Sequence, residues 1–145
     1  MNDALVDANF LIALAYPSDH HHQKAYQFIS NSLAYRLRLP TVILPEVMYM
    51  LRELGGYKAV IKLGQILADN DLPLVEMTFS DFQRAIEIMS QYQSAELDFV
   101  DACITAMAER LKINHICTFD ERDFRIIVPA HAEYFTLLPK DAEEE

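Results

Sequence analysis

Short apolar runs alternate along the chain with longer segments in which apolar residues recur at helical spacing. The short runs predict strands at 4–6, 39–44, 72–76, 115–118 and 134–138. We prefer 134–138 to the similar run 125–128 as the last strand. The longer segments predict helices at about 8–16, 20–35, 45–54, 57–68, 78–93 and 97–111. Because strands and helices alternate, we expect an α/β fold with a mostly parallel five-stranded sheet covered on both faces, with Pro73 marking an edge strand.

The first apolar run ends on a carboxylate. Residues 4–6 are continuously hydrophobic, as is typical of a central parallel strand, and Asp7 follows directly. An ionised side chain at the end of a buried strand needs a reason, and open α/β sheets bind ligands beyond the carboxyl ends of their strands. The run 115–118 repeats the arrangement, since Asp120 follows it.

Two predicted helices place an acid beside a buried face. Pro45 suits a first helical position, so Glu46 lies in the first turn of its helix. In the helix 97–111, Asp101 borders the apolar stripe and Asp98 lies further out. The buried faces predicted for three helices consist of Val47, Met50, Leu51 and Leu54; of Phe82, Ile86 and Met89, after a cap at Thr78 or Ser80; and of Val100, Ile104, Met107 and Leu111.

Four of these acids, Asp7, Glu46, Asp101 and Asp120, are candidates to meet at one edge of the sheet. Carboxylates within a few ångströms repel one another and stay ionised at neutral pH only when a cation joins them. An oxygen-only set favours Mg²⁺ or Mn²⁺ over zinc, and such an ion can activate water for phosphodiester hydrolysis. Taken singly, each acid is weak evidence, because an acid at such a position is more often a helix cap or a favourable partner for the helix dipole.

Other candidate groups give weaker signals. The histidines at 20–22 would point about 100° apart on a helix and cannot all bind one ion. Arg52 and Arg122 lie near the proposed edge, but we interpret them as solvated helix charges rather than phosphate contacts. Cys103 and Cys117 have apolar neighbours and no metal-type spacing, so we expect reduced core thiols rather than a disulfide.

Length and composition limit the class of protein. A chain of 145 residues with 52% hydrophobic residues suits a single domain, which we place at 1–139, followed by a flexible acidic tail at 140–145. The net charge of −10 repels nucleic acid, so an RNA or DNA substrate would need a metal ion and local bases. The apolar runs are too short to span a bilayer and the first residues do not resemble a signal peptide, so we expect a cytoplasmic protein without membrane partners.

Four segments together resemble the PIN domain family, close to the VapC-type toxins of bacterial toxin–antitoxin pairs. They are LVDAN at 5–9, LPEVMYML at 44–51, FVDACITAMAERL at 99–111 and TFDERDF at 118–124. The resemblance covers nearly the whole chain, and the order and spacing of the segments make it specific. It implies a three-layer α/β/α sandwich with a central parallel sheet and a metal-dependent ribonuclease centre.

The resemblance also implies roles for individual residues. Asp7, Glu46, Asp101 and Asp120 would form the acidic quartet, with Asp7 and Asp101 as direct metal ligands and Asp120 as a ligand directly or through water. The accessory positions are Asn9 and Thr118, which would brace the site, and Asp98 and Asp123, which could support it or be exposed charges. The implied partners are an RNA substrate, an antitoxin protein and a second copy of the chain.

A different class of function remains as an alternative, a PIN-like module that binds protein and has weak or no catalytic activity. The acidic surface favours it because a net charge of −10 is a poor match to RNA. The four acids count against it, since an inactive module has no need to concentrate repelling charges. A haloacid dehalogenase-type phosphatase would show a second Asp where Asn9 stands, and a response-regulator receiver would show an acidic pair on its first strand.

Overall fold

The computed structural model describes residues 2–31 and 34–143. The strands are β1 (Asn2–Val6), β2 (Tyr35–Pro40), β3 (Leu74–Val75), β4 (His115–Cys117) and β5 (Thr136–Leu138). The helices are α1 (Ala8–Ala15), α2 (His22–Asn31), α3 (Leu44–Gly55), α4 (Tyr57–Asp69), α5 (Phe79–Gln91), α6 (Phe99–Leu111), α7 (Arg122–Ile126) and α8 (Lys140–Glu143). Short 3₁₀ turns occupy Thr41–Ile43 and Gln93–Ala95.

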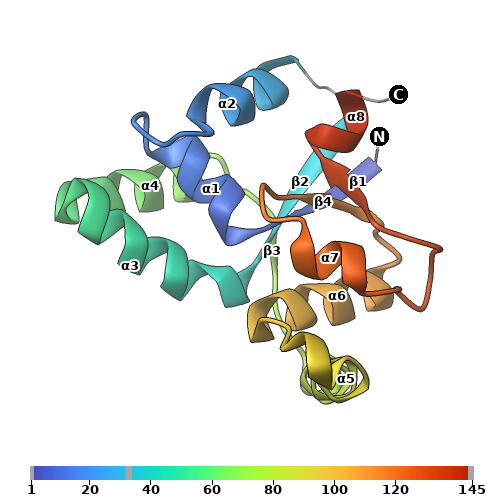
Figure 1. Cartoon of the computed structure of the whole chain (residues 1–145). Helices are drawn as coiled ribbons and strands as arrows, with labels where there is room; N and C mark the ends of the chain where they lie inside the picture. Colours follow the sequence, from blue (N-terminus) through green and yellow to red (C-terminus); the bar gives the residue numbers. More distant parts are fainter. Residues whose placement is uncertain (1, 32–33, 144–145) are drawn as a thin grey trace.

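The strands form one five-stranded sheet in the order β3-β2-β1-β4-β5, and every neighbouring pair is parallel. Helices α1 to α4 lie on one side of the sheet and α5 to α7 on the other (Figure 1). The predicted α/β sandwich is therefore confirmed, and the sheet is entirely parallel. β3, which follows Pro73, is an edge strand as expected, and β1 is central.

The core forms around β1. Ala4, Leu5 and Val6 have at most 1% of their surface exposed, because helices cover both faces of a parallel sheet. Phe10, on the buried face of α1, packs edge-on against Phe28 of α2, which holds that helix on the sheet. Each large apolar side chain buried in this way contributes about 1.5–3 kcal/mol to folding, so β1 and the residue at its end are held firmly in place.

The position predicted for the second strand, 39–44, is wrong. β2 spans Tyr35–Pro40, and the residues after it form a 3₁₀ turn that leads into α3. In β2, leucines alternate with Arg36 and Arg38, whose guanidinium groups both reach Asp3 on the neighbouring β1. The stretch follows the period of two typical of a strand, and the predicted helix at 20–35 therefore ends earlier, in the observed α2.

Two of the helix faces also differ from the prediction. In α5 the buried residues are Asp81, Ala85 and Ile88, whereas Phe82 and Ile86 are exposed. Asp81 completes a capping box with Thr78 and also accepts hydrogen bonds from Arg110 of α6, which turns this side of α5 inward. In α3 only Val47 and Leu51 of the predicted face are buried. The run 125–128 forms no strand, and the preferred 134–138 contains β5.

Cys103 and Cys117 are free and buried, as predicted. The first part of the predicted tail forms α8, and Asp141 accepts hydrogen bonds from Arg125 and from the backbone N–H of Leu137; Glu144 and Glu145 lie outside the described residues. Within the ranges 2–31 and 34–143, no helix has the length and apolarity required to cross a membrane.

Candidate active site

The carboxyl ends of β1 and β4 lie side by side, where the chain order of the sheet reverses. From β1 the chain proceeds to β2 and β3 on one side, while β4 and β5 occupy the other side. Parallel α/β sheets form a ligand-binding crevice at such a switch point, because the connections leave in opposite directions. Asp7 is the first residue beyond β1, and its backbone N–H donates to the carbonyl of Cys117 at 3.0 Å.

The Asp7 carboxylate is almost completely buried and oriented by three donors. Its Oδ1 accepts from the Ala8 N–H at 2.8 Å, which makes it the N-cap of α1. Its Oδ2 accepts from the Thr118 hydroxyl at 2.8 Å and the Asn9 side-chain amide at 3.2 Å. Burial raises the pKa of Asp7 to about 6, the bonds from Thr118 and Ala8 lower it in part, and the charges of Glu46 and Asp120 raise it.

Asn9 and Thr118 connect the end of β1 with the loop after β4. The Asn9 Oδ1 accepts from the backbone N–H of Phe119 at 2.8 Å, and Thr118 Oγ1 accepts from the N–H of Asp120 at 3.0 Å. These bonds fix the turn that carries Asp120 to the exposed rim of the crevice. Asn9 and Thr118, two of the four predicted accessory residues, therefore both contact Asp7, and Thr118 also contacts the Asp120 backbone.

Asp101 lies in the first turn of α6, opposite Asp7. Asp98 caps this helix, since its Oδ2 accepts from the N–H groups of Val100 and Asp101 at 3.1 and 3.3 Å. Asp101 is only 6% exposed. Burial raises the pKa of Asp101 to about 9, assisted by the charge of Asp7 and by a hydrogen bond to Asp123 that requires a proton.

Asp123 does not line the crevice but contacts the backbone of Asp98, which does. It is buried, and its Oδ2 accepts from the backbone N–H of Asp98 at 2.8 Å, while Oδ1 accepts from Arg122 at 2.7 Å. Asp123 thus joins α7 to the N-terminus of α6. Of the two accessory acids, Asp98 is exposed at the crevice and Asp123 is enclosed.

Glu46 approaches the crevice from α3. It lies in the first turn of that helix, directly after Pro45, which occupies the early helical position that was predicted for it. The Glu46 side chain is exposed. Partial burial raises the pKa of Glu46, and the negative charge of Asp98 adds to this effect. Glu46 belongs to α3 and Asp98 caps α6, and these two helices lie in opposite layers of the sandwich. The effect of the Asp98 charge on the pKa of Glu46 therefore shows that the two side chains approach the same crevice.

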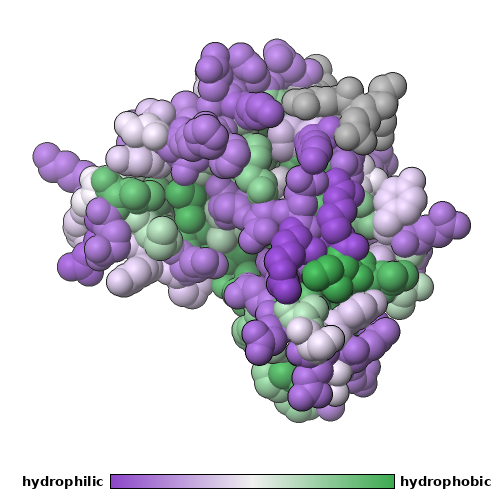
Figure 2. Space-filling view, viewed as in Figure 1, coloured by the Kyte–Doolittle hydropathy of each residue, from purple (hydrophilic) through white to green (hydrophobic). Residues whose placement is uncertain are grey.

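All four predicted acids line the same hollow of about 340 Å³. Its wall consists of Asp7, Ala8, Asn9, Ile12, Glu46, Met50, Asp98, Asp101 and Asp120. Ile12 and Met50 were not predicted for the site; Ile12 lies one helical turn after Ala8, a spacing that could have indicated it. On this face of the molecule, hydrophilic residues predominate between α1 and α7 (Figure 2).

The chemistry of this donor set fits a hard divalent cation. The oxygens are carboxylate and amide oxygens, and the burial of Asp7 and Asp101 disfavours their charged forms, which a cation would favour. Across 2–31 and 34–143, no three acidic, histidine or cysteine side chains stand close enough together to hold an ion as they are. Glu46, Asp98 and Asp120 are exposed, so rotation about their side-chain bonds can carry oxygens toward the buried pair.

The other groups considered in the sequence lie elsewhere. His22 begins α2 and bonds to the carbonyl of Ala13, while His21 precedes that helix and stacks on Phe119. Arg122 bonds to Asp123 and to the carbonyl of Ala95, and Arg52 lies over the ring of Tyr57. None of these residues lines the acidic hollow.

The chain is similar in sequence and fold to several known proteins. The chain is 24% identical over 135 residues to ribonuclease VapC26 of Mycobacterium tuberculosis, covering 93% of this chain and 99% of the relative. The fold matches the crystal structure of M. tuberculosis VapC20, described as a toxin that cleaves the sarcin-ricin loop, with a TM-score of 0.74, 21% identity, and coverage of 81% of this chain and 90% of that one.

A toxin–antitoxin complex from Klebsiella pneumoniae matches with a TM-score of 0.63 and 20% identity, over 91% of this chain and 98% of that one. The family model described as PIN domain matches residues 4–128, which include all four acids of the hollow. The chain therefore belongs to the PIN domain family and is a homologue of the VapC-type toxin ribonucleases.

Proposed function

We propose that the chain is an endoribonuclease that hydrolyses RNA phosphodiester bonds with Mg²⁺ or Mn²⁺, using Asp7, Glu46, Asp101 and Asp120. The observation that carries the proposal is the burial of Asp7 and Asp101 in the wall of one hollow at the switch point, with pKa values raised to about 6 and about 9. Buried acids with raised pKa values in a cleft are typical of functional sites. Proteins of this family are typically metal-dependent, which supports the choice of cofactor.

In this proposal, Asp7 and Asp101 hold the ion, and Asp120 joins them directly or through water. When bound, the ion supplies an activated water and polarises a phosphoryl oxygen. Glu46 is suited to accept the proton of the attacking water, because its raised pKa lies closer to the working pH than that of an ordinary glutamate. Asn9 and Thr118 keep the Asp7 carboxylate oriented, and Asp123 keeps the N-terminus of α6 in place.

We further propose that the chain is the toxin of a toxin–antitoxin pair in the cytoplasm, with an antitoxin protein and a second copy of the chain as partners. The relation to ribonuclease VapC26 and the fold match to a toxin–antitoxin complex support this context. Expression of the chain alone should arrest growth of a bacterial host. Coexpression with the adjacent gene of its source operon should restore growth and yield a complex that copurifies.

The test of the ribonuclease proposal is metal-dependent cleavage of RNA by the purified chain. We expect cleavage with Mg²⁺ or Mn²⁺, loss of cleavage in EDTA, and a loss of at least about a hundredfold in Asp7→Asn and Asp101→Asn. Asp69→Asn is the matched control, since it removes the same charge at the exposed end of α4 and should cleave like the wild type.

The alternative of a protein-binding module without activity draws on the net charge of −10. Cleavage that persists in both site variants would contradict the assigned residues. Absence of both RNA cleavage and calorimetric metal binding, together with a stable protein partner, would favour the binding module instead.

A further inference from the structure

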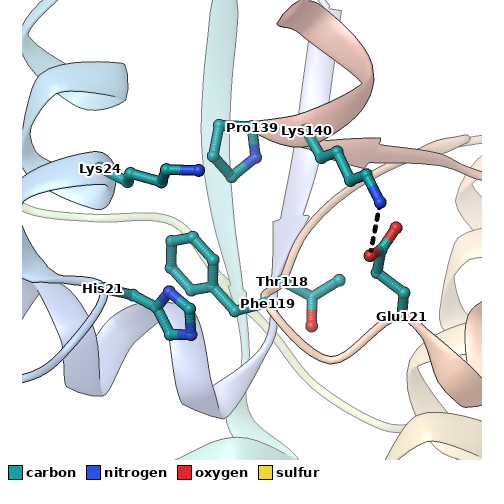
Figure 3. Close-up of a pocket in the computed structure, with 7 residues that line it drawn as sticks. All are labelled: His21, Lys24, Thr118, Phe119, Glu121, Pro139 and Lys140. Carbon is teal, nitrogen blue, oxygen red and sulfur yellow. Dashed lines mark hydrogen bonds and ion pairs between the residues drawn. The ribbon is translucent and has the colours of Figure 1, made fainter.

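A second pocket, of about 160 Å³, lies on the other side of the loop that follows β4. It is lined by His21, Lys24, Thr118, Phe119, Glu121, Pro139 and Lys140 (Figure 3). Thr118 belongs to this pocket and also donates its hydroxyl to Asp7, so a single residue separates the pocket from the acidic site. We propose that this pocket binds a phosphate of the RNA strand next to the one that is cleaved, through Lys24 and Lys140.

The two lysines come from distant parts of the chain. Lys24 lies on α2 and Lys140 begins α8, and Figure 3 shows them on opposite sides of the pocket with Pro139 between them and the Lys140 ammonium group directed at Glu121. The ammonium group of Lys24 forms no ion pair within the described part of the chain. In a protein with a net charge of −10, two cationic groups at one small pocket mark a local site for an anion.

The charge of Lys140 is partly neutralised by Glu121, whose carboxylate also pairs with Arg125. Its Nζ lies 3.2 Å from Glu121 Oε2, while the other oxygen of Glu121 pairs with Arg125 at 2.9 Å. The pair is exposed, so water screens it and a phosphate can compete for the ammonium group. Arg125 also pairs with Asp141 at 2.6 Å, so it compensates Glu121 only in part, and Lys24, unpaired among the residues that the structure describes, supplies the net positive charge of the pocket.

The floor of the pocket is rigid. The ring of Phe119 is stacked between buried Phe10, at 5.5 Å between ring centroids, and His21, at 4.3 Å and nearly parallel. The backbone N–H of Thr118 donates to the carbonyl of Leu138 at 3.0 Å, which fixes the loop against β5. A pocket of about 160 Å³ is also smaller than the roughly 300–1,000 Å³ of typical small-molecule sites, which favours a group such as a phosphate over a complete cofactor.

The position of the pocket fits a strand that passes through the acidic site. That site lies at the ends of β1 and β4, and the pocket lies at the ends of β4 and β5, so the two are neighbours along the same edge of the sheet. A phosphodiester at the acids brings the next phosphates within reach of this pocket. The acids repel those phosphates, and the lysines offset that repulsion.

This inference rests on the proposed ribonuclease function, and its test measures RNA binding separately from cleavage. The probe is a fluorescent single-stranded oligouridylate, bound in EDTA at several KCl concentrations by the full chain. Lys24→Ala/Lys140→Ala should bind about tenfold more weakly and reduce the slope of log K against log salt concentration by about 0.7, because the two lysines share one phosphate and each phosphate contact on a single strand contributes about 0.7.

The matched control is Lys58→Ala/Lys62→Ala, which removes two lysines from α4, outside both sites. It makes the same change in net charge and should keep the wild-type slope. With Mg²⁺, the pocket variant should show a KM raised by about tenfold and a kcat close to that of the wild type, as expected for contacts made equally before and during the reaction.

Equal slopes for the two double variants, or no binding of the oligouridylate by the wild type, would overturn the inference. If the pocket variant loses affinity and slope while the wild type cleaves no RNA, the phosphate site is supported and the nuclease proposal fails. If cleavage is metal-dependent and the slopes are equal, the nuclease proposal is supported and the phosphate site is not.

Discussion

Thr118 donates its hydroxyl to Asp7 Oδ2 at 2.8 Å and so joins the ends of the two central neighbours β1 and β4. Both residues are buried, with 2% and 4% of their surface exposed. A hydroxyl donor favours the charged form of a carboxylate, and this bond is the largest contribution that lowers the pKa of Asp7 against the effect of burial. The residue that follows β4 therefore lowers the pKa of the acid that follows β1, against the larger effect of burial.

Thr118→Val keeps the shape of the side chain and removes this donor. We expect the pKa of Asp7 to rise above its present value of about 6, because burial would then be opposed by fewer hydrogen bonds. RNA cleavage should require a higher pH, and stability at pH 8 should fall by about 1–3 kcal/mol. The measurements are a pH–rate profile and urea unfolding.

The matched control for this change is Thr136→Val on β5, a half-buried threonine with no side-chain hydrogen bond within the described ranges. Its pH–rate profile should coincide with that of the wild type. An unshifted profile in Thr118→Val would show that the hydroxyl does not control Asp7.

The sequence allowed prediction of the site acids because their local context is distinctive. Asp7 ends a continuous apolar run, and Asp101 stands beside an apolar stripe in a first helical turn, so both positions can be read within a few residues. Glu46 after Pro45 in a first helical turn and Asp120 after the run 115–118 could be read in the same way, and the resemblance to the PIN family then implied roles for all four. Their convergence on one hollow follows from parallel strands that end at the same edge of the sheet.

Features that depend on packing between distant segments were not predictable. The burial of Asp81 requires Arg110 on another helix, and the pocket at Lys24 requires α8 to lie beside the loop after β4. The error at β2 has a local cause, since Arg36 and Arg38 interrupt an apolar run whose period of two was not recognised. Coupling between Asp101 and Asp123 likewise depends on the position of α7.

The metal-free protein should become less stable as pH rises. Asp7 and Asp101 have pKa values of about 6 and about 9 in the folded protein against an ordinary value of 3.8, so the folded state binds more protons between these limits. Their stabilising effect is complete below about pH 4 and is lost as pH rises through 6 and then 9. For Asp7 alone, the two-unit difference corresponds to about 3 kcal/mol.

Asp101→Asn removes the larger of these two effects. In EDTA at pH 8, this variant should be more stable than the wild type by about 2 kcal/mol or more, and its Tm should depend less on pH. Thermal unfolding across a pH series measures both, with Asp69→Asn as the variant that should keep the wild-type pH dependence. A less stable Asp101→Asn would contradict the burial cost assigned to this carboxylate.

Addition of Mg²⁺ or Mn²⁺ should reverse the loss of stability at high pH. A ligand at about a hundredfold excess over its Kd stabilises the folded state by about 2.7 kcal/mol, and the carboxylates must release protons to bind it. We therefore expect a rise in Tm at pH 8 that is absent in Asp101→Asn. Calorimetry in buffers of different ionisation enthalpy should show net proton release, and a Tm insensitive to both ions would contradict a cation site at the hollow.

The ion pair between Asp81 and Arg110 should matter for the stability of the layer that carries Asp101. Asp81 is 2% exposed, and the Arg110 guanidinium donates to both of its oxygens at 3.0–3.1 Å. Burial by itself would raise the pKa of Asp81, but the bonds from Arg110 and Thr78 outweigh it and lower the pKa. The pair thus contributes stability above pH 3.8, the ordinary pKa of aspartate, and loses it as pH falls through the lowered pKa.

Arg110→Met leaves this buried carboxylate without a cation and should cost about 2 kcal/mol at pH 7, less than a fully buried pair because Arg110 is 35% exposed. Arg36→Met removes an arginine that is 61% exposed and leaves Asp3 paired with Arg38, so its cost should be much smaller. Urea unfolding of both variants at pH 7 and pH 3 measures the difference, which should shrink at the lower pH because protonated Asp81 needs no counter-charge. Equal costs at pH 7 would contradict this account, since Asp81 is buried against Arg110, whereas Asp3 is less buried and retains Arg38.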